Sequence, residues 1–296
     1  MLKPGDLTQQ LSRRTFSFKE EMWFNNFGEN LSEIRSGKSI WTLPKIIKPA
    51  LIIGGGPSIG DPAKTFKILK DSGKVDELRI FCSDRMLKPL LEAGIEADIV
   101  GSLDGDPVIA NFYDWCSSKE KTVACFATQV HPDVVKTCPY PKYWFNIMYD
   151  DPYAKGISLT RAMHWMSNKK MVTNGYGNIG GWLAGAANDL EATPIILVGI
   201  DMSYGLETAP MRTTYWEHFL EQYEGNKKLV LKECYQYITN YWGKRVLTDL
   251  YFNSYRDTLE TGIENMKSTV WNCSEYSIVS GKRVKHMTFE DALAKL

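Results

Sequence analysis

The chain has 296 residues, of which 44% are hydrophobic and 24% are charged, and its 35 basic residues balance 35 acidic ones to a formal net charge of zero. This ordinary globular composition excludes a disordered tail, a collagen-like chain and a coiled coil. A neutral chain also lacks the broad basic surface that grips a nucleic-acid backbone, so we expect no nucleic-acid partner.

Residues 1–48 are predicted to form a helical N-terminal cap. Apolar side chains recur there at roughly helical spacing, and Asn30 and Gly37 are expected to interrupt the helix. The recurring residues are Phe16, Trp23, Phe24, Phe27 and Leu31. No catalytic set of residues is visible in this segment.

Residues 49–210 are the predicted core, in which short apolar strands alternate with helices. Strands are predicted over 50–53, 79–82, 98–100, 123–126, 143–145 and 194–199, and helices over 86–93 and 180–189. This alternation predicts a Rossmann-like α/β fold, with a doubly wound, mostly parallel sheet and helices on both faces. Such sheets bind ligands beyond the carboxyl ends of their strands, near the point where the strand order reverses.

Residues 211–296 are rich in aromatic side chains and are predicted to form a largely helical lid, with a terminal strand and helix that complete the core. Segments 271–274 and 277–279 suggest a last strand or hairpin, and Thr288 is expected to cap a helix over 289–293. We interpret the aromatic residues as core or lid packing, with stacking on a ligand ring as the alternative.

The spacing of the six cysteines and the length of the apolar runs indicate the cellular compartment of the protein. No two cysteines have C-x-x-C spacing, and no cysteine–histidine group has the spacing of a zinc site. Free, mostly buried thiols in a reducing compartment are the simplest explanation. Residues 1–18 hold no signal-peptide core, and runs such as 194–200 are too short to cross a bilayer. We therefore expect a cytoplasmic protein without membrane insertion.

The first predicted strand of the core ends in a glycine-rich turn. The turn consists of Gly54, Gly55, Gly56, Pro57 and Ser58. Glycines let the backbone approach a ligand, and free N–H groups at a helix start favour an anion such as phosphate. No Gly-Lys-Ser/Thr follows, and Ile59 stands where a dinucleotide fingerprint has its third glycine. We interpret the turn as a phosphate or nucleotide contact, with a tight turn without ligand as the alternative.

Aspartates follow three of the predicted strands. Asp104 and Asp106 flank Gly105, which is expected to let both carboxylates turn inward onto a shared Mg²⁺; an aspartate-rich turn that caps itself is the alternative. Asp84 ends a neighbouring strand and is expected to lie near this pair, close to the cofactor. Asp201 follows the strand 194–199 and is either a ligand of a metal or hydroxyl, or the cap of the next segment.

A second glycine-rich run opens the helix predicted over 180–189. Asn174, Gly177, Asn178 and Gly180 are its candidate ligand-binding residues, because a helix start offers free N–H donors. The predicted role is a second anion or sugar contact, and close packing of the helix on the sheet is the alternative.

The chain resembles the 6-hydroxymethylpterin diphosphokinase-like family in several segments that follow in order. The first half of the resemblance consists of 49–59, Cys82-Ser83-Asp84 and 97–106, and the second half consists of 177–180 and 196–201. The resemblance covers residues 49–205 and implies a Rossmann-like fold related to thiamin pyrophosphokinases. One branch of the family transfers diphosphate from ATP to the hydroxymethyl group of a dihydropterin, with Mg²⁺. The other comprises the motility-associated factors, implicated as flagellin glycosyltransferases that use nucleotide-activated nonulosonic acids.

The resemblance divides between the two branches. It implies that Asp104 matches the second aspartate of the D-x-D-G strand end of the diphosphokinases, whereas Ser102 stands where that branch has the first, so that Asp106 would have to compensate. The segments 23–26 and 271–275 resemble the glycosyltransferase branch instead.

The predicted function is therefore a transferase with a nucleotide-activated donor, whose partners are a small-molecule nucleotide and an acceptor. Mg-ATP-dependent diphosphate transfer to a hydroxymethylpterin-like alcohol is the first expectation. Glycosyl transfer from a nucleotide sugar and non-catalytic nucleotide or sugar-phosphate binding are the alternatives. Asp104 and Asp201 are the candidates for a carboxylate that takes the acceptor's proton. The acceptor and the oligomeric state stay open, a homo-oligomer included.

Overall fold

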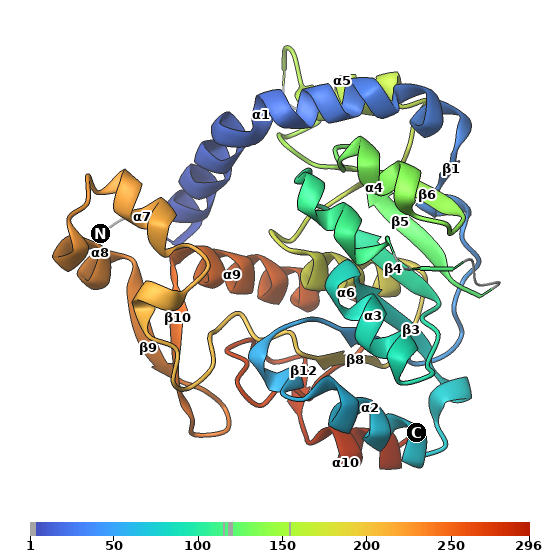
Figure 1. Ribbon diagram of the computed structural model, residues 1–296, viewed down its shortest axis with the longest axis vertical. Coiled ribbons are helices and arrows are strands. Elements are labelled where there is room, and N and C mark those ends of the chain that lie inside the picture. Colours follow the sequence, from blue (N-terminus) through green and yellow to red (C-terminus); the bar gives the residue numbers. More distant parts are fainter. Residues whose placement is uncertain (1–3, 115, 118–120, 154) are drawn as a thin grey trace.

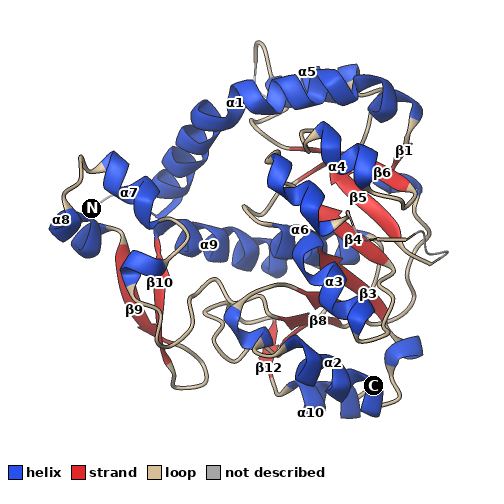
Figure 2. Cartoon of the chain, in the orientation of Figure 1, coloured by secondary structure: helices blue, strands red, loops and turns tan. Residues whose placement is uncertain are grey.

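The computed structural model describes residues 4–114, 116–117, 121–153 and 155–296, with side chains described from residue 19 onward. Its centre is a ten-stranded sheet flanked by helices (Figures 1 and 2). The strands of this sheet are β1 (Lys38–Ser39), β2 (Ala50–Ile53), β3 (Arg79–Ser83), β4 (Ile99–Ser102), β5 (Val123–Ala127), β6 (Lys142–Ile147), β7 (Val172–Thr173), β8 (Ile195–Val198), β11 (Val270–Asn272) and β12 (Val284–His286). The helices are α1 (Pro4–Ser36), α2 (Pro62–Asp71), α3 (Asp84–Glu92), α4 (Pro132–Thr137), α5 (Leu159–Met166), α6 (Ile179–Asp189), α7 (Trp216–Gln222), α8 (Lys227–Glu233), α9 (Leu250–Asn265) and α10 (Phe289–Ala294).

All strand pairs described in this sheet are parallel, in the order β1-β6-β5-β4-β3-β2-β8-β11-β12, with β7 paired to β6. The central strands β2, β5 and β8 are short apolar runs, and each residue of β2 is at most 1% exposed. A strand buried on both faces reads as an unbroken apolar run, which is typical of a parallel sheet covered by helices. The predicted α/β fold with a mostly parallel sheet is confirmed.

The strand order reverses at β2. Strands β3 to β6 extend on one side of β2, whereas β8, β11 and β12 extend on the other. Ile53 at the end of β2 lies beside Val198 at the end of β8, so the loops that begin at Gly54 and Gly199 are neighbours. These two loops flank the switch point of the sheet, which is where doubly wound folds bind ligands.

The N-terminal segment forms one long helix, α1, which crosses the top of the molecule in Figure 1. It runs through Asn30, so the predicted interruption there is wrong, whereas the helix does end immediately before Gly37. Phe27 and Ile34 are buried in the same core as the sheet. The side chain of Phe16 lies outside the described residues.

The C-terminal region contains a hairpin that helical spacing of its aromatic residues concealed. β9 (Tyr235–Thr239) and β10 (Arg245–Asp249) pair antiparallel beside α7 and α8, as Figure 2 shows. The side chains of this region pack on one another in a second buried cluster, as the packing interpretation predicts. The buried members of the cluster are Tyr204, Trp216, Phe219, Val230, Cys234, Tyr235, Leu247 and Tyr251.

The end of the chain differs from the expected hairpin. β11 and β12 pair in parallel, and 277–279 form a loop rather than a strand. The amide of Asn272 donates to Val279 O (3.1 Å) and to Ser277 Oγ (3.0 Å), which holds this loop folded back on the strand end. The terminal helix α10 begins as predicted, since Thr288 Oγ1 accepts a hydrogen bond from Asp291 N (3.1 Å).

All six cysteines are free, and five of them are buried, in agreement with the expectation from their spacing. Within the described part of the chain, no helix combines the length and the apolar character needed to cross a membrane.

Candidate functional site

The glycine-rich turn after β2 is held against the loop after β8. Gly56 N donates to Gly199 O (2.9 Å), and a Cβ added at Gly54 would lie 2.5 Å from the same carbonyl oxygen. Pro57 and Ser58 then begin a short 3₁₀ helix, residues 57–59. The close approach of two backbones thus accounts for Gly54 and Gly56 without a ligand.

Asp201 closes this turn from the opposite loop. Its carboxylate is 3% exposed and accepts hydrogen bonds from Ser58 N (3.0 Å) and from the Ser58 hydroxyl, which itself accepts one from Tyr276 N (2.8 Å). Burial raises the pKa of Asp201 to about 6, and the bonds from Ser58 oppose that rise. Asp201 therefore caps the 3₁₀ helix that starts at Pro57. One of the two expectations from the sequence was that it would instead cap the segment that follows Asp201 itself.

Gly55 is the exposed residue of the turn. A Cβ added there would meet only the Arg85 side chain, at 3.4 Å from Cδ, and the sulfur of Met86 at 3.6 Å. Arg85 is exposed and lies in the first turn of α3. The part of the predicted phosphate contact that stays accessible is thus Gly55, with a guanidinium group beside it.

A buried hydrogen-bonded chain joins the ends of β3 and β4. Ser102 is fully buried and donates to Asp84 Oδ2 (2.7 Å), while its oxygen lies 2.9 Å from the hydroxyl of Tyr113. Burial raises the pKa of Asp84 to about 6; its bonds to Ser102 and to Arg85 N oppose the rise, and the charge of Asp104 adds to it. Asp84 and Asp104 therefore lie near each other, as predicted.

Asp104 carries an accessible carboxylate at this edge. It is 46% exposed and pairs with Lys19 from α1, whose Nζ lies 3.1 Å from Oδ1 and 3.4 Å from Oδ2. Asp106 turns away to cap the 3₁₀ helix 107–112, where its Oδ1 accepts from Val108 N (2.9 Å). Both aspartates thus have partners within the chain, as the alternative of a self-capping turn expects for Asp106.

Gly105 serves the docking of α1. An added Cβ would lie 2.8 Å from Asn26 Nδ2 and 2.9 Å from Gln129 O. The Asn26 amide donates to the carbonyl oxygens of Gly105 (2.9 Å) and Gln129 (3.0 Å), and the Asn30 amide donates to Val130 O (2.8 Å). α1 is therefore fixed to the loops after β4 and β5 through main-chain carbonyls.

The glycine-rich run 174–180 is held by its own asparagines and is closely packed. Asn174 Oδ1 accepts from Tyr176 N (2.9 Å), and Asn178 Oδ1 caps α6 by accepting from Gly181 N (3.0 Å). Gly177 has a φ of +74°, and a Cβ there would collide with Tyr255. Its neighbours Gly180 and Gly181 would meet Ile200 and Tyr176 in the same way. This geometry favours the packing alternative for the run.

The C-terminal region covers part of this edge. Tyr255 from α9 packs on Gly177, and the amide of Asn178 lies 3.7 Å from the sulfur of Met202. Burial raises the pKa of Tyr255 to about 12, and the negative charge of Asp104 contributes to the rise. The described site is thus bounded by strand ends, by α1 through Lys19 and Asn26, and by α9 through Tyr255.

Three residues of the site could not be found from motifs. Lys19, Arg85 and Tyr113 belong to no recognisable pattern, and Lys19 is 85 positions from the aspartate that it pairs with. Only their position in space identifies them. Lys19 and Arg85 each lie next to a carboxylate of this edge, and Tyr113 belongs to the hydrogen-bonded series that holds Asp84.

The two aspartates predicted to hold Mg²⁺ at this edge both have partners within the chain. Among the described residues, no group of three or more histidine, cysteine, aspartate or glutamate side chains could hold a metal ion. Mg²⁺ binds through one or two carboxylates and substrate phosphates. Here the ammonium of Lys19 stands beside Asp104, and the carboxylate of Asp106 caps a helix. We therefore derive no reaction step through a metal.

Comparisons with known proteins agree with this fold. The family model for 6-hydroxymethylpterin diphosphokinase MptE-like proteins matches residues 25–207. No curated protein matches the chain significantly. Among solved structures, the MAf glycosyltransferase from Magnetospirillum magneticum AMB-1 superposes with a TM-score of 0.62 at 14% identity, over 99% of this chain and 50% of that one. The chain thus spans about half the length of that structure, and at this identity the likeness concerns the fold.

Proposed function

Because the chain belongs to the 6-hydroxymethylpterin diphosphokinase MptE-like family, we propose that it is a transferase, and that it transfers a glycosyl group from a nucleotide sugar to an acceptor hydroxyl. The family and the glycosyltransferase fold both support a transferase. The choice of a glycosyl group depends on the side chains at the end of β4.

One observation carries that choice: an ammonium group of the chain itself, that of Lys19, lies beside the Asp104 carboxylate at the end of β4. Ser102 is buried and bonded to Asp84 and Tyr113, and Asp104 is paired with Lys19. A diphosphokinase needs a divalent ion to offset the charge that develops on the transferred phosphates. Glycosyl transfer needs only the leaving phosphate to be offset, which a fixed cation can do.

The proposed reaction uses Asp104 as the general base. The acceptor oxygen attacks the anomeric carbon of the donor, and the bond between that carbon and the phosphate oxygen breaks. The electron pair of this bond leaves with the nucleotide, and the hydroxyl proton passes to the Asp104 carboxylate. Asp104 is preferred over Asp201 because Asp201 is 3% exposed and already bonded to Ser58.

The donor phosphate is proposed to lie at the exposed part of the turn after β2. Gly55 leaves room for an approaching phosphate, and the Arg85 guanidinium beside it provides a positive charge. Arginine is suited to this role because its planar fork donates two parallel hydrogen bonds to a phosphate.

The second candidate is diphosphate transfer, which the description of the family favours. In that reaction the acceptor hydroxyl attacks the β-phosphorus of ATP, the bond to the α-phosphate oxygen breaks, and AMP leaves. Mg²⁺ would then be required, with Asp104 as one carboxylate ligand.

One experiment separates these candidates. The purified protein is titrated with CMP-, UDP- and GDP-sugars and with ATP, in Mg²⁺ and in chelator, and nucleotide release with candidate acceptors is followed by chromatography. We expect a nucleotide sugar to bind equally in both buffers, and Asp104→Asn to lose turnover while Asp106→Asn keeps it. Metal-dependent conversion of ATP to AMP would establish the second candidate instead. Ligand binding without any turnover would leave a binding module.

A further inference from the structure

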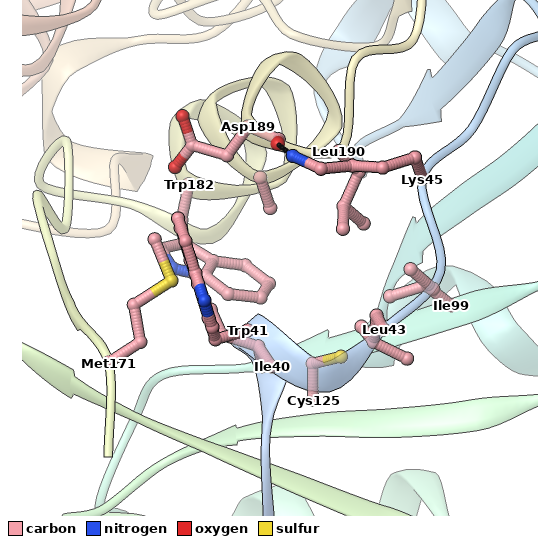
Figure 3. A pocket seen from close by; sticks show the side chains of 11 residues that line it. Ile40, Trp41, Leu43, Lys45, Ile99, Cys125, Met171, Trp182, Asp189 and Leu190 are labelled. Carbon is pink, nitrogen blue, oxygen red and sulfur yellow. Dashed lines mark hydrogen bonds between the residues drawn. The ribbon is translucent and has the colours of Figure 1, made fainter. Parts of the chain in front are cut away.

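A cavity of about 140 Å³ lies beside α6 (Figure 3), and Asp104 is not among the residues that line it. It is bounded by the C-terminal half of α6, by the segment 40–45 and by β4 and β5. Ile99 is the first residue of β4, and Leu190 follows the last turn of α6. The cavity therefore opens toward the amino ends of the strands, and the proposed transferase reaction makes no use of it.

The walls of the cavity are apolar and fixed. Trp182 stacks on Phe145 with ring centroids 4.0 Å apart, and its indole N–H donates to Thr173 Oγ1 (3.0 Å). Ile99 and Cys125 contribute buried side chains from two neighbouring strands. A wall held in this way cannot collapse to fill the space, so the cavity persists as a site for an apolar group.

The size of the cavity selects a single ring. An engineered apolar cavity of about 150 Å³ in another protein stays dry and binds benzene. A cavity of about 140 Å³ therefore holds one six-membered ring with a short substituent, and a fused ring system would extend past Trp41, which is 69% exposed at the opening.

The opening carries one carboxylate that is available to a ligand. The ammonium of Lys45 donates to Asp189 O (3.0 Å) and pairs with Glu191 (3.1 Å). Its positive charge also opposes the rise that burial causes in the pKa of Asp189, so one ammonium faces two carboxylates at the opening. The carboxylate of Asp189 lines the cavity and accepts only a long hydrogen bond, 3.4 Å, from Asn188 Nδ2 among the described residues. A ligand with a positively charged end would find its partner here.

We propose that this cavity binds a small aromatic amine, with its ring between Trp182 and the floor of Ile99 and Cys125 and its ammonium group on the Asp189 carboxylate. The proposal is independent of the transferase reaction. It predicts a preference for positive charge over neutral and negative ligands of the same ring size.

The test uses three probes that share a phenyl ring and differ in its single substituent: benzylamine is positively charged, toluene is neutral and benzoate is negatively charged. Binding is measured by saturation-transfer NMR and by quenching of tryptophan fluorescence on the whole chain. We expect benzylamine to bind about three- to fivefold more tightly than toluene, as a partly exposed ion pair allows, and benzoate to bind most weakly. No binding of benzylamine at millimolar concentration, or equal binding of the three probes, would overturn the proposal.

Variants locate the two ends of the ligand. Asp189→Asn should abolish the preference for benzylamine and leave toluene binding unchanged, whereas Glu217→Gln, which neutralises an exposed carboxylate on α7 outside the cavity lining, should keep the preference. Ala186→Leu should fill the cavity and remove all binding, and Leu43→Trp at the half-buried opening is the second filling variant if Ala186→Leu does not fold. Unchanged benzylamine binding in a folded filling variant would refute the assignment to this cavity.

Discussion

The carboxylate of Asp201 accepts hydrogen bonds from both the backbone N–H and the hydroxyl of Ser58, across the point where the strand order reverses. Ser58 and Asp201 are 143 positions apart in the sequence, and they join the two halves of the sheet at its switch point. In many α/β proteins an anionic ligand occupies the N–H groups at this place. Here a side chain of the protein takes one of those N–H groups, and a ligand has to use the neighbouring residues.

The first prediction separates two glycines of the same turn. Gly56→Ala should lower the free energy of unfolding by about 1–3 kcal/mol, because its Cβ would collide with the Asp201 carboxylate. Gly55→Val should fold normally, since only the flexible Arg85 and Met86 side chains lie nearby, but it should weaken nucleotide binding. Thermal denaturation and calorimetric titration measure both effects. Equal stability of the two variants would contradict the geometry of the turn, and wild-type affinity in Gly55→Val would contradict the phosphate contact.

The second prediction concerns Ser58. Ser58→Ala removes one of the two hydrogen bonds to a carboxylate that is 3% exposed. A buried charged group that loses a partner costs about 1–3 kcal/mol, and we expect a loss of stability of this size in urea unfolding at pH 7. The loss should shrink at pH 5, where Asp201 is largely protonated because burial raises its pKa to about 6. A pH-independent loss would mean that the ionised form is not the one that Ser58 stabilises.

The third prediction follows from Asp84. Burial raises its pKa from the model-compound value of 3.8 to about 6, so the folded state holds the proton more tightly than the unfolded state between these values. The resulting stabilisation is full below pH 4 and is lost as the pH rises through 6. Asp84→Asn should remove this dependence, about 2–3 kcal/mol over the full range.

Urea unfolding between pH 5 and 7.5 tests this prediction, with the exposed Asp106→Asn as the control. The wild type should become less stable toward pH 7.5, and Asp84→Asn should show a smaller change than the control. The same slope in both variants would place the proton elsewhere, for example on Asp201, whose pKa is raised in the same direction.

The fourth prediction addresses the counter-ion of Asp104. Lys19→Met should free the carboxylate and make nucleotide affinity depend on Mg²⁺, because the ammonium no longer stands 3.1 Å from Oδ1. Titrations in Mg²⁺ and in chelator on both proteins measure this. If the wild type already binds nucleotide more tightly with Mg²⁺, Lys19 yields to the metal and the diphosphokinase candidate gains support.

The fifth prediction concerns Ser102, which stands where the diphosphokinase branch has its first aspartate. Ser102→Asp restores that aspartate. Ser102 is fully buried and 2.7 Å from the Asp84 carboxylate, so a second carboxylate there would be an unpaired buried charge. We expect a destabilised protein with a lower melting temperature, whereas Ser102→Ala should be milder. A stable Ser102→Asp variant that binds Mg²⁺ more tightly than the wild type would contradict this prediction and support the diphosphokinase candidate.

The sequence predicted the central strands of the sheet well because β2 and β8 are short, buried apolar runs that are each followed by a glycine. Residues 50–53 and 195–198 can form little else when such runs are buried on both faces. The hairpin of β9 and β10 was missed because the aromatic-rich region was interpreted as largely helical, and the burial of β9 does not alternate cleanly from one residue to the next. Periodicity alone cannot separate a helix from a strand in so short a segment.

The candidate site was only partly predictable, for a different reason. The sequence located strand ends, and the proximity of Asp84 to Asp104 follows from neighbouring strands. The sequence could not show which polar side chains find their hydrogen-bond partners within the chain. Asp201 and Asn178 look like free ligands in the sequence, but each caps a helix start in the structure. Such pairings depend on loop conformation, which no local pattern encodes.

Asn26 and Asn30 belong to α1, and their side-chain amides donate only to main-chain oxygens of the neighbouring loops. A carbonyl oxygen is the same whatever side chain its residue carries. Residues around Asp104 can therefore diverge among relatives, or be randomised in a library, without releasing α1 from the sheet. Gly105 is the exception, because any side chain there would meet the Asn26 amide. The fold thus offers a loop whose chemistry can be exchanged while its attachment stays constant.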